Sequence, residues 1–196
     1  LKIADWQGDR PFLDPMCGSG TIPIEAALMA AHIPANFYRK DFGFHNWNNY
    51  EPERWSSIRA AAQELFRPVT VPIMGYDKSL RAVKIIDDNL RAAHLSTVIE
   101  VEKHNFLKVE APHEAGLLVM NPPYDERLSN ADIDAFYKKI GDHLKQAFSG
   151  WDAWMISSNL DALKYVGLRP SQKTTLFNGP LECKYQHYEL YQGSRK

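Results

Sequence analysis

The chain has 196 residues, of which 44% are hydrophobic and 24% charged, and its formal net charge is −1 at pH 7. That size suits one globular domain with a substantial core, and the near-neutral charge excludes a strongly basic, free-standing nucleic-acid binder. No apolar run reaches transmembrane length, two cysteines give no disulfide framework, and the histidines lack metal-ligand spacing, so we expect a cytoplasmic protein without membrane or metal partners.

The first elements form a corner of the kind that binds nucleotides. Residues 11–14, Pro-Phe-Leu-Asp, predict a short strand, and residues 15–20 predict a glycine-containing turn. Residues 21–32 predict a helix, because apolar side chains recur on one face. In a strand, glycine turn and helix N-terminus of this order, Gly18 and Gly20 would let the backbone approach a ligand closely.

Residues 34–55 carry a dense set of aromatic side chains with arginine and lysine between them. The rings are Phe37, Tyr38, Phe42, Phe44, Trp47, Tyr50 and Trp55. One interpretation is a long connection packed over the sheet, and the other is an RNA-facing surface with stacking rings. Residues 56–66 predict a helix after this segment.

The remainder of the chain alternates strands with helices. Strands are predicted at 71–77, 97–101, 117–120, 151–157, 173–177 and 184–191, and helices at 78–94, 131–148 and 160–166. This alternation predicts an α/β fold with a doubly wound, mostly parallel seven-stranded sheet, to which the closing strand-turn-strand adds an antiparallel edge with an antiparallel C-terminal strand. Asn178-Gly179 signals a hairpin between the last two strands, although Pro180 argues against a tight two-residue loop.

Asn121-Pro122-Pro123-Tyr124 stops the continuous apolar strand at 117–120. Neither proline can donate to a sheet ladder, and each holds the residue before it extended, so the chain is stiff where open α/β sheets bind ligands. Such a turn presents an amide from Asn121, a carbonyl from Pro122 and a ring from Tyr124. Those groups can hold a planar amine. The alternative is a turn that only ends a strand.

These motifs together resemble a known family. Residues 14–21, Asp77 and residues 121–124 are similar to class I S-adenosylmethionine-dependent methyltransferases, whose fold is Rossmann-like. The stretches 14–27, 121–128 and 176–183 resemble, more narrowly, the bacterial ribosomal RNA guanine-N2 methyltransferases that carry a THUMP domain. This resemblance implies a catalytic domain over residues 1–196, cut from a longer chain. The THUMP domain, absent from this sequence, would supply much of the RNA affinity.

The resemblance implies S-adenosylmethionine as the cofactor. The residues it places there are Asp14, Pro15, Cys17, Gly18, Ser19, Gly20, Thr21, Asp77, Lys78, Asn105 and Phe106. Asp14 would lie near the ammonium group of the cofactor, and Asp77 would accept from the ribose hydroxyls. As alternatives, Asp14 could serve only the turn and Asp77 could cap the next helix. Cys17 is expected to be a packing residue.

The catalytic residues implied are Asn121, Pro122, Pro123 and Tyr124. Asn121 and Pro122 would accept hydrogen bonds from the N–H groups of the target amine, while Tyr124 would stack on a base that has left its own stack. The expected substrate is the N2 amine of a guanine in ribosomal RNA. Asp125 stands where the family more often has glycine, which leaves the target base open. Adenine N6 in nucleic acid and a protein glutamine amide present the same kind of planar amine to this motif, so they remain alternatives. A third hypothesis is a non-catalytic module that binds the cofactor and RNA.

Overall fold

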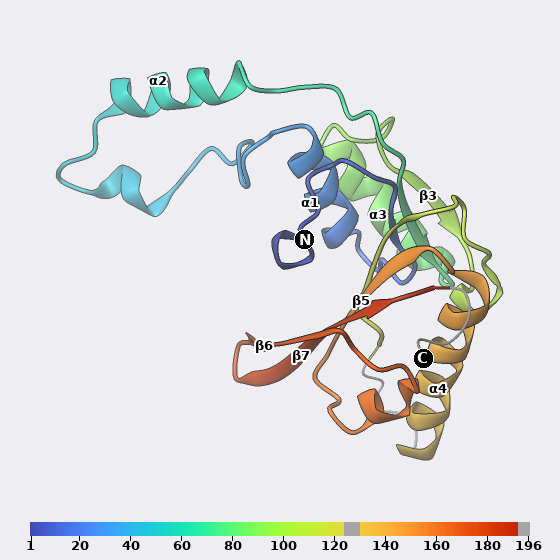
Figure 1. Cartoon of the computed structure of the whole chain (residues 1–196). Helices are drawn as coiled ribbons and strands as arrows, with labels where there is room; N and C mark the ends of the chain where they lie inside the picture. The colour runs from blue at the N-terminus through green and yellow to red at the C-terminus, as the bar shows by residue number, and fades with distance from the viewer. Residues whose placement is uncertain (124–129, 192–196) are drawn as a thin grey trace.

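The computed structural model describes residues 1–123 and 130–191, and the strands there form one sheet (Figure 1). They are β1 (Phe12–Asp14), β2 (Ile73–Asp77), β3 (Glu100–Lys103), β4 (Gly116–Met120), β5 (Trp151–Ser157), β6 (Gln172–Asn178) and β7 (Leu181–Glu189). Their order is β3-β2-β1-β4-β5-β7-β6. Among these strands, β7 alone runs opposite to the other six. The predicted seven-stranded α/β fold is therefore confirmed.

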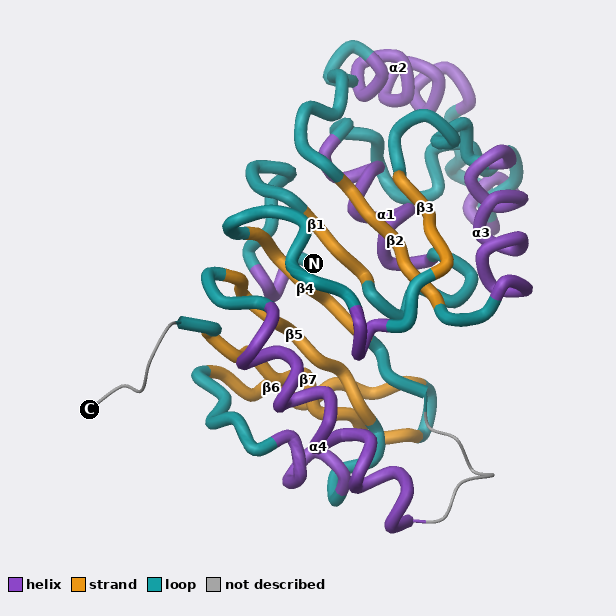
Figure 2. The backbone as a smooth tube through the Cα atoms, turned by 90° about the vertical axis from the view of Figure 1, so that its right-hand side faces the viewer, coloured by secondary structure: helices purple, strands orange, loops and turns teal. Residues whose placement is uncertain are grey.

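Helices cover both faces of this sheet (Figure 2). The α-helices are α1 (Thr21–Ala30), α2 (Pro52–Gln63), α3 (Leu80–Ala92) and α4 (Asn130–Ala147), and short 3-10 helices are η1 (Lys2–Ala4), η2 (Gly43–Asn46), η3 (Phe106–Lys108) and η4 (Ala162–Val166). One core joins α1 and α3 to the sheet, and a second joins α4 and η4 to the opposite face.

Strand β4 lies at the centre because both of its faces are apolar. All five of its residues are buried. Leu117 and Val119 belong to the core under α1 and α3, whereas Leu118 and Met120 belong to the core under α4. This is the burial that a continuous apolar run predicts for a central parallel strand.

The C-terminal hairpin forms one edge of the sheet, as predicted, but β7 begins at Leu181 rather than at residue 184. Antiparallel β7 lies next to β5, and β6, which runs parallel to β5, is the outermost strand. The reason is burial: β7 contributes Tyr185 to one core and Tyr188 to the other, while no residue of β6 is buried. Asn178 pairs with Leu181, so the loop has only two residues despite its proline. Gly179 has φ of 59°, and the fixed negative φ of proline suits the second central position of a type II′ turn.

The starts of β3 and α2 also differ from the sequence prediction. Strand β3 begins at Glu100 rather than at residue 97, because Val98 and Ile99 turn back and donate to the carbonyl of Leu95. Helix α2 begins at Pro52 rather than at residue 56. Proline is favoured at a first helical position because the N–H it lacks would have no partner there.

Residues 34–66, which we call the arm, project from the sheet (Figure 1). None of them is buried, so the interpretation of a connection packed over the sheet is wrong. The rings pack on one another instead: the Phe44 ring lies 5.1 Å from that of Phe42 and 5.0 Å from that of Trp55. Trp47 is 66% exposed at the margin of this cluster.

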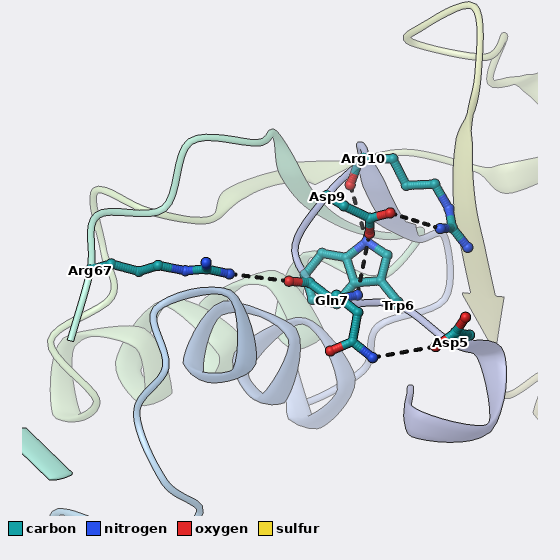
Figure 3. Close-up of polar contacts among 6 residues, drawn as sticks. All are labelled: Asp5, Trp6, Gln7, Asp9, Arg10 and Arg67. Carbon is teal, nitrogen blue, oxygen red and sulfur yellow. Dashed lines mark hydrogen bonds and ion pairs between the residues drawn. The ribbon is translucent and has the colours of Figure 1, made fainter. Parts of the chain in front are cut away.

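The base of the arm is fastened to the N-terminal segment (Figure 3). Arg67 donates from Nη2 to the carbonyl of Gln7 at 3.3 Å and from Nε to the carbonyl of Ala30 at 2.9 Å. The fully buried Trp6 donates from Nε1 to the carbonyl of Arg10 at 3.0 Å. Residues before the first strand are therefore part of the core, which their composition did not predict.

Candidate functional site

A cavity of about 580 Å³ opens at the carboxyl ends of the central strands. Its described lining comprises Asp14, Pro15, Met16, Cys17, Gly18, Ser19, Thr21, Ile22, Asp77, Lys78, His104, Asn105, Phe106, Leu107, Asn121, Pro123 and Phe136. The parallel register explains the gathering, because β1 pairs with both β2 and β4 and all three strands end at this edge. Three segments that lie far apart in the sequence thus meet at one site.

The two glycines of the first turn have different surroundings. At Gly18, where φ is 54°, an added Cβ would meet nothing within 4 Å, so the backbone there borders open space. At Gly20, where φ is 86°, an added Cβ would lie 2.3 Å from Cγ1 of Ile86. Gly20 therefore permits α1 to pack closely on α3, and it is not among the residues that line the cavity.

Asp14 ends β1 inside the cavity wall with 1% of its surface exposed. Its Oδ1 accepts from the N–H of Met16 at 3.1 Å, so part of its role is to hold the turn. Burial, with a smaller contribution from the charge of Asp77, raises the pKa of Asp14 to about 7. A cation beside this carboxylate would stabilise its charged form.

Asp77 joins the turns that follow β1 and β2. Its Oδ2 accepts from the N–H of Gly18 at 3.2 Å, and its Oδ1 accepts from the N–H of Ser79 at 2.8 Å. The cap of α3 is Ser79, whose side chain accepts from the N–H of Ala82. The alternative in which Asp77 itself caps this helix is therefore wrong, and its carboxylate keeps lone pairs that can face a ligand.

Asn105 and Phe106 form the side of the cavity next to β3. Asn105 caps η3, and its Oδ1 accepts from the N–H of Leu107 at 3.2 Å. The Phe106 ring is 2% exposed and packs in the core, 5.0 Å from the ring of His143. His104 also lines the cavity. Sequence reasoning missed His104, although its place directly before Asn105 was a signal.

Cys17 is buried, and burial raises the pKa of its thiol well above the ordinary value. Its side chain packs against Gly75, where an added Cβ would be 3.4 Å from Sγ. A thiol that stays protonated is a poor nucleophile, so the surroundings of Cys17 fit the packing role expected of it.

The proline turn after β4 forms the opposite wall. Asn121 and Pro123 are exposed and line the cavity, whereas Pro122 is buried. Tyr124 and Asp125 lie outside the described residues. Phe136 of α4 also borders the cavity.

Among the described residues, no group of three or more His, Cys, Asp or Glu side chains is placed to hold a metal ion. None of the helices found in residues 1–123 and 130–191 is long and apolar enough to cross a membrane.

Comparison with known proteins identifies the family. Residues 1–187 match a family described as RMKL-like, methyltransferase domain. The ribosomal RNA large subunit methyltransferase K/L of Psychromonas ingrahamii is 36% identical over 97% of this chain, which spans 26% of that protein. SMU.472, described as a methyltransferase and solved in complex with SAH, has a TM-score of 0.88 at 28% identity, and the match covers 98% of this chain and 51% of that one.

A further solved relative carries a different name. A predicted N6-adenine-specific DNA methylase from Listeria monocytogenes has a TM-score of 0.79 at 29% identity, over 94% of this chain and 48% of that one. The chain thus spans about half or less of each of these relatives. The family match runs through the glycine turn, the proline turn and most of the C-terminal hairpin. On this evidence the chain belongs to the RMKL-like methyltransferase domain family.

Proposed function

We propose that this protein transfers a methyl group from S-adenosylmethionine to the exocyclic N2 amine of a guanine in ribosomal RNA, in the cytoplasm. The observation that carries the proposal is that Asn121 and Pro123 line the same cavity as the glycine turn and the buried Asp14. The K/L relative, named for ribosomal RNA, supports the substrate class. The SAH complex of SMU.472 supports the cofactor.

The residues present fit this cofactor. Its bound form supplies a methyl group on a sulfonium centre. The volume of the cavity lies in the range of small-molecule sites. Asp14 would face the ammonium group, and the backbone at Gly18 and Ser19 would approach the amino-acid end. Asp77 would accept from the ribose hydroxyls, while Lys78, Asn105 and Phe106 would border the adenosine.

The turn after β4 would hold the substrate amine. The exocyclic amine of guanine is a weak nucleophile because its lone pair is delocalised into the ring. Oxygens of Asn121 and Pro122 would accept hydrogen bonds from its two N–H groups, which directs the nitrogen lone pair at the methyl group. Tyr124 would stack on the base. The rate enhancement would then come from positioning and oriented dipoles, without a covalent intermediate.

Adenine N6 is the second candidate target. The name of the Listeria relative favours it, and adenine presents the same kind of planar amine to the Asn-Pro-Pro turn. A domain that precedes this chain, which we expect to be a THUMP domain, would grip the RNA. That expectation agrees with the small share of the K/L relative that the chain spans.

The test is methyl transfer by the natural protein into ribosomal RNA from a strain that lacks it. Nucleosides from the digested RNA are then identified by mass spectrometry. We expect N2-methylguanosine. N6-methyladenosine would establish the second candidate. Methyl transfer into protein alone would refute RNA methylation, and so would no methyl transfer by a protein that binds SAH.

Asn121→Ala tests the mechanism in the same assay. Loss of one oriented acceptor should lower kcat at saturating RNA by about 100-fold or more, while the Kd for SAH changes less than about twofold. Asn48→Ala, an exposed amide on the arm, is the control and should leave kcat unchanged. A kcat for Asn121→Ala equal to that of the control would show that the amide does not act on the amine.

A further inference from the structure

The hairpin of β6 and β7 extends beyond the strand on which it is built (Figure 1). Ser157 is the last residue of β5, and it pairs with Lys184 of β7. Residues 181–183 therefore run on past the end of β5. At about 3.3 Å per residue, the hairpin tip overhangs β5 by about 10 Å.

This overhang lies on the same edge of the sheet as the proline turn. Met120 pairs with Met155, and Met155 pairs with Gln186, so the residues after Met120 are level with the part of β7 that leads to the tip. Neighbouring strands are about 4.8 Å apart. The tip is therefore displaced sideways from β4 by about 10 Å at β7 and about 14 Å at β6.

Two large apolar side chains stand exposed at this tip. Phe177 is 70% exposed and Leu181 is 54% exposed, and neither belongs to the two cores formed by the described residues. Phe177 pairs with Glu182, the neighbour of Leu181, so the two apolar side chains lie on opposite faces of the hairpin.

The tip is also braced. Gly179 and Pro180 close it in a two-residue turn, and the proline ring restricts the backbone. On one face Lys184 Nζ donates to Thr175 Oγ1 at 2.7 Å and contacts Glu182 Oε1 at 2.6 Å. A rigid apolar tip loses little conformational entropy when it binds. On an edge strand, exposed apolar side chains carry a risk of pairing with other chains.

We propose that Phe177 and Leu181 form an RNA-contacting tip that stacks on nucleotides next to the target base while that base enters the cavity. This inference rests on the proposed function. A base must leave its stack before its amine can reach an enclosed site, and exposed aromatic side chains hold unstacked bases of any sequence. A lateral distance of about 10–14 Å suits a neighbouring nucleotide, whereas the target base itself must lie against the turn after β4.

The experiment compares Phe177→Ala, Phe177→Trp and Leu181→Ala in the natural protein. The substrate is ribosomal RNA from a strain that lacks the enzyme, and the Kd for SAH is measured alongside. We expect Phe177→Ala to raise the KM for RNA about tenfold or more, since one stacked ring commonly contributes that much. Leu181→Ala should raise it less, Phe177→Trp should keep it within about twofold, and no variant should change the Kd for SAH.

The control is Ile85→Ala, which removes an exposed apolar side chain from α3 and should leave the KM for RNA unchanged. A KM within twofold of wild type for Phe177→Ala would overturn the inference while the proposed function stands. A KM for Phe177→Trp as high as that for Phe177→Ala would also overturn it. A change in the oligomeric state of either Phe177 variant on size-exclusion chromatography would do the same. Wild-type protein that binds SAH but methylates no RNA would refute the proposed function, and this inference with it.

Discussion

Replacing Asp14 by asparagine should stabilise the cofactor-free protein and weaken cofactor binding. Asp14 is 1% exposed, and burial is the main reason that its pKa rises from 3.8 to about 7. The charge of Asp77 contributes in the same direction. Asparagine cannot ionise, yet its Oδ1 can still accept from the N–H of Met16. The variant therefore removes a buried charge and keeps the turn.

The magnitude follows from the shift in pKa. A rise of about 3 units corresponds to about 4 kcal/mol at 1.36 kcal/mol per unit. Because the folded state holds this proton more tightly than the unfolded state, the free energy of unfolding falls as the pH rises from about 4 to about 7. Above that range the full cost is present. Asp14→Asn should therefore exceed wild type in stability by up to about 4 kcal/mol at pH 8, and the difference should vanish near pH 4.

The assay is urea denaturation of the cofactor-free protein between pH 5 and pH 8, with the Kd for SAH measured at each pH. If SAH binds through its ammonium group to ionised Asp14, wild-type affinity should be about tenfold lower at pH 6 than at pH 8. The affinity of the variant should be lower and nearly independent of pH. Asp88→Asn, at an exposed position on α3, should reproduce wild type in both measurements. A stability difference between Asp14→Asn and wild type that does not vary with pH would refute this reasoning.

Three further substitutions test close packing at the glycine turn and one buried hydrogen bond. Gly20→Ala should lower the free energy of unfolding by about 2–4 kcal/mol, since its Cβ would collide with Ile86 and positive φ adds strain. Gly18→Ala, where an added Cβ has space, should lower the free energy of unfolding less but weaken SAH binding. Equal losses of stability for the two variants in urea would contradict this distinction. Tyr137→Phe removes the buried hydrogen bond of 2.8 Å to Ser157 Oγ and should lower stability by about 1–2 kcal/mol. Thermal unfolding with Tm unchanged would show that this bond contributes nothing.

Local patterns were sufficient for most of the sheet. The apolar run of β4 predicted burial on both faces, and all five residues are buried. The glycine turn and the proline turn were placed correctly at the ends of strands. Glycine widens and proline restricts the backbone conformations of a segment, whatever surrounds it. Parallel strands share one carboxyl edge, and in the structure Asp14, Asp77 and Asn121 line one cavity at that edge.

The arm shows where local pattern fails. Its aromatic side chains satisfied the same criteria as core residues, yet they pack on one another and leave Trp47 exposed. Composition records how apolar a segment is, whereas burial depends on which other segment lies opposite. The buried Trp6 is the converse case, since nothing within its neighbouring sequence indicates that it packs in the core.

The sequence by itself determined the order of strands and helices, the two special turns and the family resemblance, because these depend on residues close together in the chain. Only the tertiary structure decided that Gly20 faces Ile86, that β7 lies inside the sheet and that Phe177 stands exposed beyond β5. Each of these depends on contacts, or on missing contacts, between segments far apart in sequence. The same long-range packing removes water from Asp14 and so sets its pKa.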